Sequence, residues 1–271
     1  MRIAVTGASG NVGGHVASLL TEAGGHDVVG LSRRGPVHAD YDDLASLRAA
    51  LREVDTLVFV SSDGEAARMI TQHANVVRAA ADEGVAHVVY LSGLDADVAS
   101  PFCYAYTNGT TEAMLAGSGC ATSVVRASIF TEFFAGFLDR ARESGTLRLP
   151  TGGARISLVS REDVGRCLAA LALGPPTGRV HAVTGPVALD LEAIAAATER
   201  RWRTPVRPVD VPAAAFATEL AERGEDPWWS YAYASMFASV REGRWDAVSD
   251  EVRLLTGRAP LPFGDVLPPR P

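Results

Sequence analysis

A chain of 271 residues, 47% of them hydrophobic, has enough apolar material for one large α/β domain, or for a main domain with a smaller appendage. Its formal net charge of −7 argues against nonspecific nucleic-acid binding, which needs a basic surface. No apolar run reaches membrane-spanning length, and the chain begins on a strand rather than on a cleavable signal. We therefore expect a cytoplasmic protein without nucleic-acid or membrane partners.

The N-terminal segment carries the most informative motif. A short apolar strand at residues 3–5 leads into a turn with Gly7, Gly10 and Gly13, and an apolar helical pattern follows. This order is typical of dinucleotide binding, because glycine lets backbone N–H groups approach the pyrophosphate and the helix N-terminus adds partial positive charge. The alternative is a tight turn without a ligand. The predicted cofactor contacts here are Gly7, Ala8, Ser9, Gly10, Asn11 and Val12.

The next hundred residues alternate between strands and helices. Helices are expected at about 43–52, 65–82 and 104–117, and further strands at 27–31, 37–40, 56–60, 87–91 and 123–126. Parallel strands need crossover helices of this length. The sequence therefore predicts an α/β fold, a Rossmann-like doubly wound parallel sheet with a smaller C-terminal α/β substrate domain.

The pattern changes after residue 128. We expect a helix at 129–142, a strand at 156–159 that runs into Ser160 as a helix N-cap with the acid Asp163 three positions on, and a strand at 179–184. Helix and a proline-rich tail follow. The predicted division is an NAD(P)-binding domain at 1–128 and a smaller substrate-binding or capping domain at 129–271, with a strand from about 155–184 able to return to the main sheet.

The end of the second strand indicates which cofactor is bound. NAD-preferring sites place an acid there to bind the ribose 2′-hydroxyl, but this chain has Ser32, Arg33 and Arg34. A guanidinium can pair with a 2′-phosphate, so NADPH (NADP+) is the predicted cofactor and Arg33 its contact. The bland alternative is that both arginines are simply solvated. Asp40 and Tyr41 either cover the adenine or belong to an exposed loop.

Several segments together resemble a known family. Residues 6–13 (TGASGNVG) resemble the fingerprint of atypical short-chain dehydrogenases of the NmrA-like group. Residues 60–62, 72–77, 90–93, 111–115 and 125–126 are similar to the bacterial NAD(P)H:quinone oxidoreductase branch of that group. The resemblance covers most of the first 170 residues and weakens beyond about residue 200. It implies NADPH lying across the C-terminal strand ends, with Ser61, Ser62, Ser92 and residues 126–130 facing the nicotinamide.

The catalytic residues of short-chain dehydrogenases are matched only in part. Ser92 and Tyr104 have about the usual separation, but the position four after Tyr104 is Asn108 instead of lysine. Without that cation the tyrosine keeps a high pKa and is a poor acid. Tyr104, Ser92 and Asn108 remain the catalytic candidates, and Asn108 and Glu112 are placed near the nicotinamide ribose. Alternatively, Tyr104 is a packed aromatic residue and Ser92 a turn hydroxyl.

Two aromatic groups are candidates for substrate contact. The preferred one is the helical face made by Phe130, Phe133, Phe134 and Phe137. A second stripe either lines a pocket for a flat aromatic substrate or packs in the core; its members are Trp229, Tyr233, Met236 and Phe237. The histidines and cysteines show no metal-ligand spacing, so no metal is expected.

Our main hypothesis is an NADPH-dependent oxidoreductase that transfers hydride to a quinone or a related conjugated carbonyl compound. A quinone is a good hydride acceptor, which makes the missing lysine less damaging. One alternative is a non-catalytic NmrA-like NADP(H) redox sensor. Another is a tailoring reductase or cyclase acting on an aromatic polyketide-like metabolite. The expected partner is a small, aromatic or quinonoid substrate, and a homodimer is left open.

Overall fold

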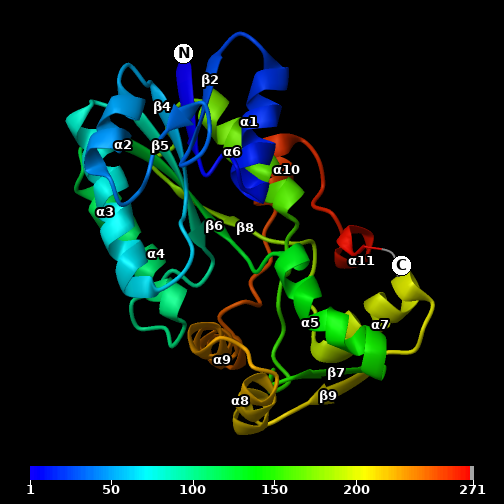
Figure 1. Cartoon of the computed structure of the whole chain (residues 1–271). Coiled ribbons are helices and arrows are strands. Elements are labelled where there is room, and N and C mark those ends of the chain that lie inside the picture. The colour runs from blue at the N-terminus through cyan, green and yellow to red at the C-terminus, as the bar shows by residue number, and fades with distance from the viewer. Residues whose placement is uncertain (269–271) are drawn as a thin grey trace.

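The computed structural model describes residues 1–268, and its central feature is a parallel sheet of seven strands between two layers of helices (Figure 1). The strand order is β3-β2-β1-β4-β5-β6-β8. The strands are β1 (Arg2–Thr6), β2 (Asp27–Ser32), β3 (Val37–His38), β4 (Thr56–Val60), β5 (His87–Gly93), β6 (Ala121–Ala127) and β8 (Val180–Val183). The predicted Rossmann-like doubly wound sheet is confirmed.

The strands are apolar on both faces because helices cover both. In β4 the residues from Thr56 to Phe59 are all buried, and Val58 is in register with Val5 of β1 and Val89 of β5. Val58 contributes to one apolar cluster and its neighbour Phe59 to another, since successive side chains point to opposite faces. One face is covered by α1 (Asn11–Ala23), α6 (Arg161–Leu173) and α10 (Glu251–Thr256), the other by α2 (Leu44–Leu51), α3 (Ala66–Asp82) and α4 (Cys103–Ala116).

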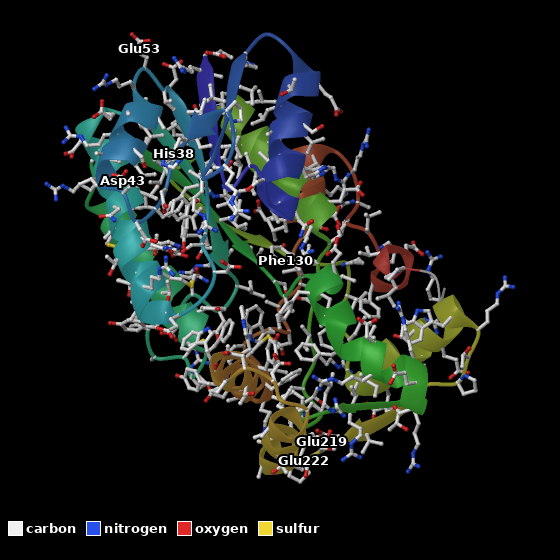
Figure 2. All side chains as sticks on the ribbon, viewed as in Figure 1. His38, Asp43, Glu53, Phe130, Glu219 and Glu222 are labelled. Atoms are coloured by element: carbon white, nitrogen blue, oxygen red, sulfur yellow. The ribbon has the colours of Figure 1, made fainter. Side chains whose placement is uncertain are left out.

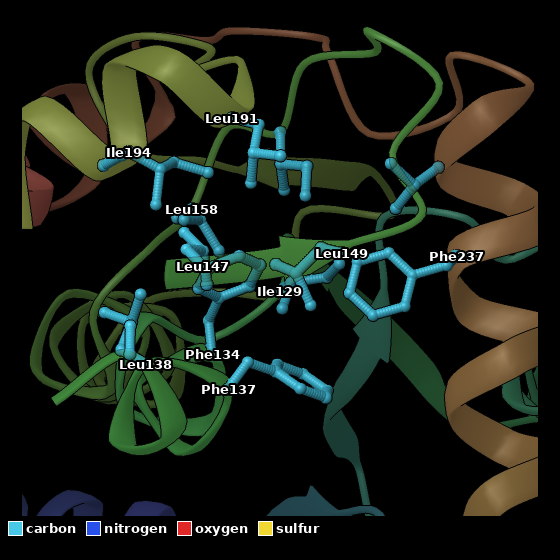
Figure 3. Close-up of a cluster of buried hydrophobic side chains, with 14 of the residues drawn as sticks. Ile129, Phe134, Phe137, Leu138, Leu147, Leu149, Leu158, Leu191, Ile194 and Phe237 are labelled. Atoms are coloured by element: carbon cyan, nitrogen blue, oxygen red, sulfur yellow. The ribbon is translucent and has the colours of Figure 1, made fainter. Parts of the chain in front are cut away.

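A second, smaller group of elements lies beyond the C-terminal ends of the strands, and we call it the cap (Figure 1). It consists of α5 (Thr131–Ser144), β7 (Thr146–Leu149), α7 (Leu191–Trp202), β9 (Arg207–Asp210), α8 (Ala213–Glu222), α9 (Pro227–Arg241) and α11 (Phe263–Val266). These elements share one apolar core in which Phe134 and Phe137 of α5 meet Leu147 and Leu149 of β7 (Figure 3). The cap is thus packed around its own core.

Three late elements return to the sheet. β8 pairs with β6, α6 packs on α1, and α10 packs on α6. The predicted N-cap of α6 is confirmed, since Ser160 Oγ accepts the N–H of Asp163 and donates to its carboxylate. The chain therefore crosses between the sheet and the cap several times.

Some sequence-based expectations need correction. Residues 156–159 form no strand; they make two isolated bridges, Ile156 with Leu189 and Val159 with Phe130. The strand expected at 37–40 is shorter, as β3 ends at His38. The pair β7 and β9 was not anticipated, because β9 contains Pro208 and each strand is only four residues long.

The strand order fixes where a ligand can bind. β1 lies between β2 and β4, so the connections after these strands run to opposite sides and leave a crevice at their C-terminal ends. The glycine turn follows β1 at this point. Among residues 1–268, no helix is long and apolar enough to span a bilayer.

Candidate functional site

A cleft of about 780 Å³ lies where the C-terminal ends of the strands face the cap. Its walls come from the loops after β1, β2, β4, β5 and β6 and from α9 of the cap. Figure 2 shows Phe130, which begins the crossing into α5, between the sheet and the cap. The glycine motif after β1 and the aromatic stripe of α9 therefore face the same cleft.

The glycine turn forms a cradle for an anion. Gly7 has a φ of +62°, which L side chains rarely adopt, and the N–H of Gly10 donates to the Gly7 carbonyl over 2.8 Å. A Cβ at Gly13 would clash with that same carbonyl, so α1 can approach the turn only with glycine there. Gly10 is the N-cap of α1 and offers no side chain to the first N–H groups, which are left for a ligand. The turn fits a pyrophosphate.

The far end of the cleft suits an adenosine. Arg33 and Asp40 line it, and Tyr41 forms part of its wall. The Tyr41 hydroxyl donates to the Val60 carbonyl over 2.6 Å, and burial raises its pKa, so this residue offers its ring and not its proton. The Asp40 carboxylate accepts the N–H of Asp42. Arg33 is exposed, follows directly after β2 and lines the cleft, so it offers a positive charge at this end.

Two buried polar atoms in this cleft have no protein partner among the described residues. One is the Oε1 atom of Gln72, whose amide nitrogen donates to both oxygens of Asp42 over 3.1 Å. The other is the hydroxyl of Ser62. Buried polar groups normally have a hydrogen-bond partner, so both atoms are available to a polar ligand in the cleft.

His73 is held neutral beneath the cleft. Its Nε2 accepts the N–H of Ser62 over 3.1 Å, so its Nδ1 carries the proton and donates to Thr111 over 2.8 Å. Burial lowers the pKa of His73 to about 4. The imidazole therefore positions the backbone of Ser62 and is no acid at neutral pH.

Ser92 belongs to a charged group behind the cleft wall. Its hydroxyl donates to Glu112 over 2.6 Å, and Arg126 forms a two-bond ion pair with the same carboxylate at 2.9 and 2.7 Å. Ser92 itself is buried and lines the cleft, whereas Glu112 does not. The arrangement fixes the ends of β5 and β6 to α4.

Asn108 occupies the place of the missing lysine. Tyr90 donates to its Oδ1 over 3.1 Å, which turns the amide NH₂ toward the backbone of Gly93. A Cβ at Gly93 would lie 2.7 Å from that nitrogen, so glycine makes room for the amide. Asn108 and Gly93 both line the cleft. An oriented N–H donor therefore lies at the site.

The hydroxyl of Tyr104 is already engaged. It donates to the Gly64 carbonyl over 2.9 Å, and burial raises its pKa. The ring packs against Phe102 and Trp228. Tyr104 lines the cleft as an aromatic wall.

The substrate side of the cleft is mainly aromatic. Phe130 and Phe133 line it, but Phe134 and Phe137 do not; both are buried in the cap core. A helix shows only part of its circumference to a cleft, so the expected face is divided between the two. The second stripe divides in the same way: Trp229, Tyr233 and Met236 line the cleft and Phe237 lies in the core.

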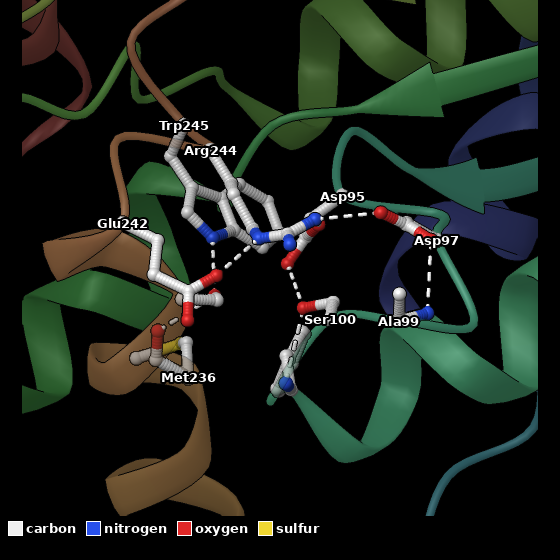
Figure 4. A network of polar contacts seen from close by, with 10 residues as sticks. Asp95, Asp97, Ala99, Ser100, Met236, Glu242, Arg244 and Trp245 are labelled. Atoms are coloured by element: carbon white, nitrogen blue, oxygen red, sulfur yellow. Dashed lines mark hydrogen bonds and ion pairs between the residues drawn. The ribbon is translucent and has the colours of Figure 1, made fainter.

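A group of ion pairs lies next to the residues that line this end of the cleft. Arg244, which follows α9, lies between Asp95 and Asp97 of the loop after β5 and Glu242 (Figure 4). Its neighbour Trp245 packs edge-on against Phe102, and both line the cleft. The ion pairs thus hold a cap segment against a sheet loop.

The cleft brings together most of the residues that the sequence nominated. Those lining it are Gly7, Ser9, Gly10, Asn11, Val12, Arg33, Asp40, Tyr41, Ser61, Ser62, Ser92, Tyr104, Asn108, Phe130 and Phe133. Ala8 does not line it; its N–H donates to the Leu31 carbonyl. The sequence missed five lining residues, namely Met69 and Gln72, which lie three positions apart on α3, and Phe102, Arg161 and Trp245, which come from three other parts of the chain.

Comparisons with known proteins find related sequences. A model of the NmrA-like family matches residues 1–227. Quinone oxidoreductase 2 of Escherichia coli strain K12 is 30% identical over 236 residues, 82% of either chain. The (4-alkanoyl-5-oxo-2,5-dihydrofuran-3-yl)methyl phosphate reductase of Streptomyces griseus is 30% identical and covers 97% of this chain and 95% of its own.

Solved structures show the same fold over nearly all of the chain. An NADPH-dependent quinone oxidoreductase from Escherichia coli, complexed with NADPH, has a TM-score of 0.90 at 27% identity and covers 97% of both chains. The triphenylmethane reductase of Citrobacter sp., complexed with NADP(H), also has a TM-score of 0.90, covering 97% of this chain and 98% of its own at 24% identity.

Proposed function

The chain belongs to the NmrA-like family, and we propose that this NADPH-dependent oxidoreductase transfers hydride to a quinone or a related conjugated carbonyl compound. The observation that carries the proposal is the combination of an aromatic cleft with hydroxyl groups that are already engaged. Tyr104 donates to Gly64, and Ser92 donates to Glu112. A reaction that needs Tyr104 or Ser92 as the acid in the hydride step finds both hydroxyls bonded elsewhere, whereas a quinone spreads the developing charge over its own ring.

The residues that would bind the cofactor are those of the glycine turn and those whose buried polar atoms have no partner within residues 1–268. The N–H groups at the start of α1 would hold the pyrophosphate, and Arg33 the 2′-phosphate. Gln72 Oε1 and the Ser62 hydroxyl would receive polar groups of the same ligand. NADPH supplies the hydride when it is bound.

We assign to Asn108 the stabilisation of charge on the acceptor. Its amide is oriented by Tyr90, so it can donate to a developing oxyanion without first having to reorganise. Ser92, Glu112 and Arg126 act as positioning residues, because their bonds hold the wall beside Asn108. The aromatic residues of the cleft orient a flat substrate by stacking and exclude water.

A conjugated lactone is the second substrate candidate. The Streptomyces griseus relative is named as a reductase of a (4-alkanoyl-5-oxo-2,5-dihydrofuran-3-yl)methyl phosphate, in which a ring double bond is conjugated with carbonyl groups. Such a compound accepts hydride at carbon and places the charge on oxygen, as a quinone does. The same cleft chemistry therefore serves both.

The test is acceptor-dependent loss of NADPH absorbance with the purified chain. We expect oxidation with 1,4-naphthoquinone, and none with cyclohexanone, which lacks conjugation. Tyr233→Ala removes a cleft wall and should raise the KM for naphthoquinone about fivefold, since an aromatic contact contributes about 1 kcal/mol. The matched control is Tyr231→Ala on the same helix, which is 55% exposed and does not line the cleft. NADPH binding without oxidation by any conjugated acceptor would overturn the proposal and favour a sensor.

A further inference from the structure

A second hollow lies on the cap, away from the cleft. Its volume is about 620 Å³, and it is enclosed by α5, β7, β9 and α8. None of its lining residues is shared with the cleft. Phe137, Leu149 and Val209 give it an apolar floor. Figure 2 shows Glu219, one of its lining residues, on α8 at the end of the cap farthest from the sheet.

The rim of this hollow carries an excess of positive charge. Four arginines line it, Arg140, Arg148, Arg207 and Arg223, against two acids, Glu143 and Glu219. The formal charge of the lining is therefore +2, in a chain whose net charge is −7. Positively charged side chains are thus concentrated in the hollow, although the protein as a whole has a negative net charge.

Only part of this charge is neutralised by the protein itself. Arg148 donates twice to Oε1 of Glu219, at 2.9 and 2.6 Å, and Arg223 lies 4.0 Å from the other oxygen. The side chains of Arg140 and Arg207 make no ion pair or hydrogen bond with any residue of the described range 1–268. Two guanidinium groups therefore remain available to a ligand.

Of the two guanidinium groups, that of Arg140 is the more buried and lies near another positive charge. It is half-buried on α5, and burial together with the positive charge of Arg223 lowers its pKa, against the opposing effect of the acids Glu225 and Glu219. A cation that is partly desolvated and repelled by a like charge gains from an anion placed beside it.

We propose that this hollow binds an organic dianion, a phosphate monoester whose phosphate lies on Arg140 and Arg207 and whose apolar body lies on Phe137, Leu149 and Val209. Guanidinium groups pair with phosphate through two parallel hydrogen bonds, and a phosphate monoester carries close to two negative charges at neutral pH. The charge of the ligand then matches the excess of the rim. This site is separate from the hydride-transfer cleft and does not depend on the substrate proposed for it.

The experiment is calorimetric titration of the full chain with phenyl phosphate. The protein is first saturated with NADP+, so that the phosphate-binding groups of the cleft are occupied. We expect one saturable site, with inorganic phosphate weaker because it lacks the apolar body and benzoate weaker because it is a monoanion. Arg140→Gln and Arg207→Gln should each weaken phenyl phosphate binding at least about tenfold, the loss of one charge-assisted pair.

The matched control is Arg52→Gln, which removes one exposed arginine from the sheet part of the molecule. It should leave the affinity within about twofold, and thermal unfolding of all three variants checks that they are folded. Absence of a saturable site in the wild-type chain would overturn the proposal. Equal affinities in all variants would also overturn it, because the phosphate would then bind elsewhere.

Discussion

At the scale of single residues, the site is defined by which side-chain hydrogens are free. Tyr104 and Tyr41 each donate to a backbone carbonyl, and burial raises the pKa of both. His73 is held neutral, because burial lowers its pKa to about 4. The amide of Asn108 remains as the oriented donor. A cleft of this kind stabilises charge better than it transfers protons.

Asn108→Leu should therefore slow turnover. Removing one preorganised donor to an oxyanion typically costs 10²-fold or more, and about tenfold to hundredfold is expected here because a quinone stabilises its own charge. The measurement is kcat for NADPH oxidation with 1,4-naphthoquinone. Tyr104→Phe is the comparison and should change kcat by no more than about twofold, since it removes only a bond to Gly64. A larger loss in Tyr104→Phe than in Asn108→Leu would reverse our assignment.

Arg33→Ala should weaken the binding of NADPH much more than the binding of NADH. A guanidinium that pairs with the 2′-phosphate contributes nothing to a cofactor without that group. We expect the KM for NADPH to rise at least about tenfold and the KM for NADH to stay within about twofold. The adjacent Arg34→Ala is the matched control, because Arg34 does not line the cleft. Equal losses for both cofactors in Arg33→Ala would contradict the assignment.

At the scale of elements, the junction of β1 and α1 depends on close backbone approach. The helix lies against the turn because Gly13 has no Cβ to meet the Gly7 carbonyl. His15, two residues further along α1, packs equally closely against Gly165 of α6. The position of the anion cradle is thus set by glycine at contacts between elements.

Gly13→Ala should both destabilise the fold and weaken the binding of NADPH. The added methyl group forces α1 away from the turn, and overpacking of this kind costs about 1–3 kcal/mol. The free energy of unfolding in urea and the Kd for NADPH are the measurements. Gly136→Ala is the control: this glycine lies exposed within α5, a Cβ there meets nothing within 4 Å, and alanine should stabilise the helix by about 0.5–1 kcal/mol. Unchanged NADPH affinity in Gly13→Ala would show that the cradle tolerates displacement.

At the scale of the whole molecule, the cap is tied to the sheet by a few specific contacts. Arg244 pairs with Asp97 at 2.7 Å and with buried Asp95 at 3.4 Å. The N–H of Cys103 at the start of α4 donates to Ser235 of α9. These contacts border the cleft, so the shape of the site depends on how the two parts are joined.

Arg244→Gln should destabilise the protein in a pH-dependent way. Burial raises the pKa of Asp95, and Arg244 opposes this shift. A carboxyl whose pKa is higher in the folded chain than in the unfolded chain destabilises the fold as the pH rises through the folded value. Without Arg244 this penalty grows, so the loss in unfolding free energy should be about 1–3 kcal/mol at pH 7 and smaller near pH 4, where more Asp95 is protonated.

The double variant Asp95→Asn with Arg244→Gln tests this explanation. With no buried carboxylate to compensate, the added cost of Arg244→Gln should fall below about 1 kcal/mol at pH 7. Urea unfolding at the two pH values measures it. A loss that is the same at both pH values would mean that Arg244 acts through packing alone.

The sequence by itself determined the parts that depend on local pattern. The glycine spacing, the apolar strands and the absence of an acid after β2 predicted the parallel sheet, the cradle and the place of Arg33, because each effect acts within a few residues. Ser160 was likewise predictable as the N-cap of α6, since the cap involves only the four successive positions from Ser160 to Asp163.

Only the tertiary structure decided the rest. Whether Phe133 or Phe134 faces the cleft depends on the rotation of α5 against the cap, and Gln72, Phe102 and Trp245 meet there from three distant segments. The pairing of β7 with β9 joins residues that are about sixty positions apart. The sequence also did not show which hydroxyl groups are already hydrogen-bonded. A bond such as that from Tyr104 to Gly64 forms only once distant segments have packed together.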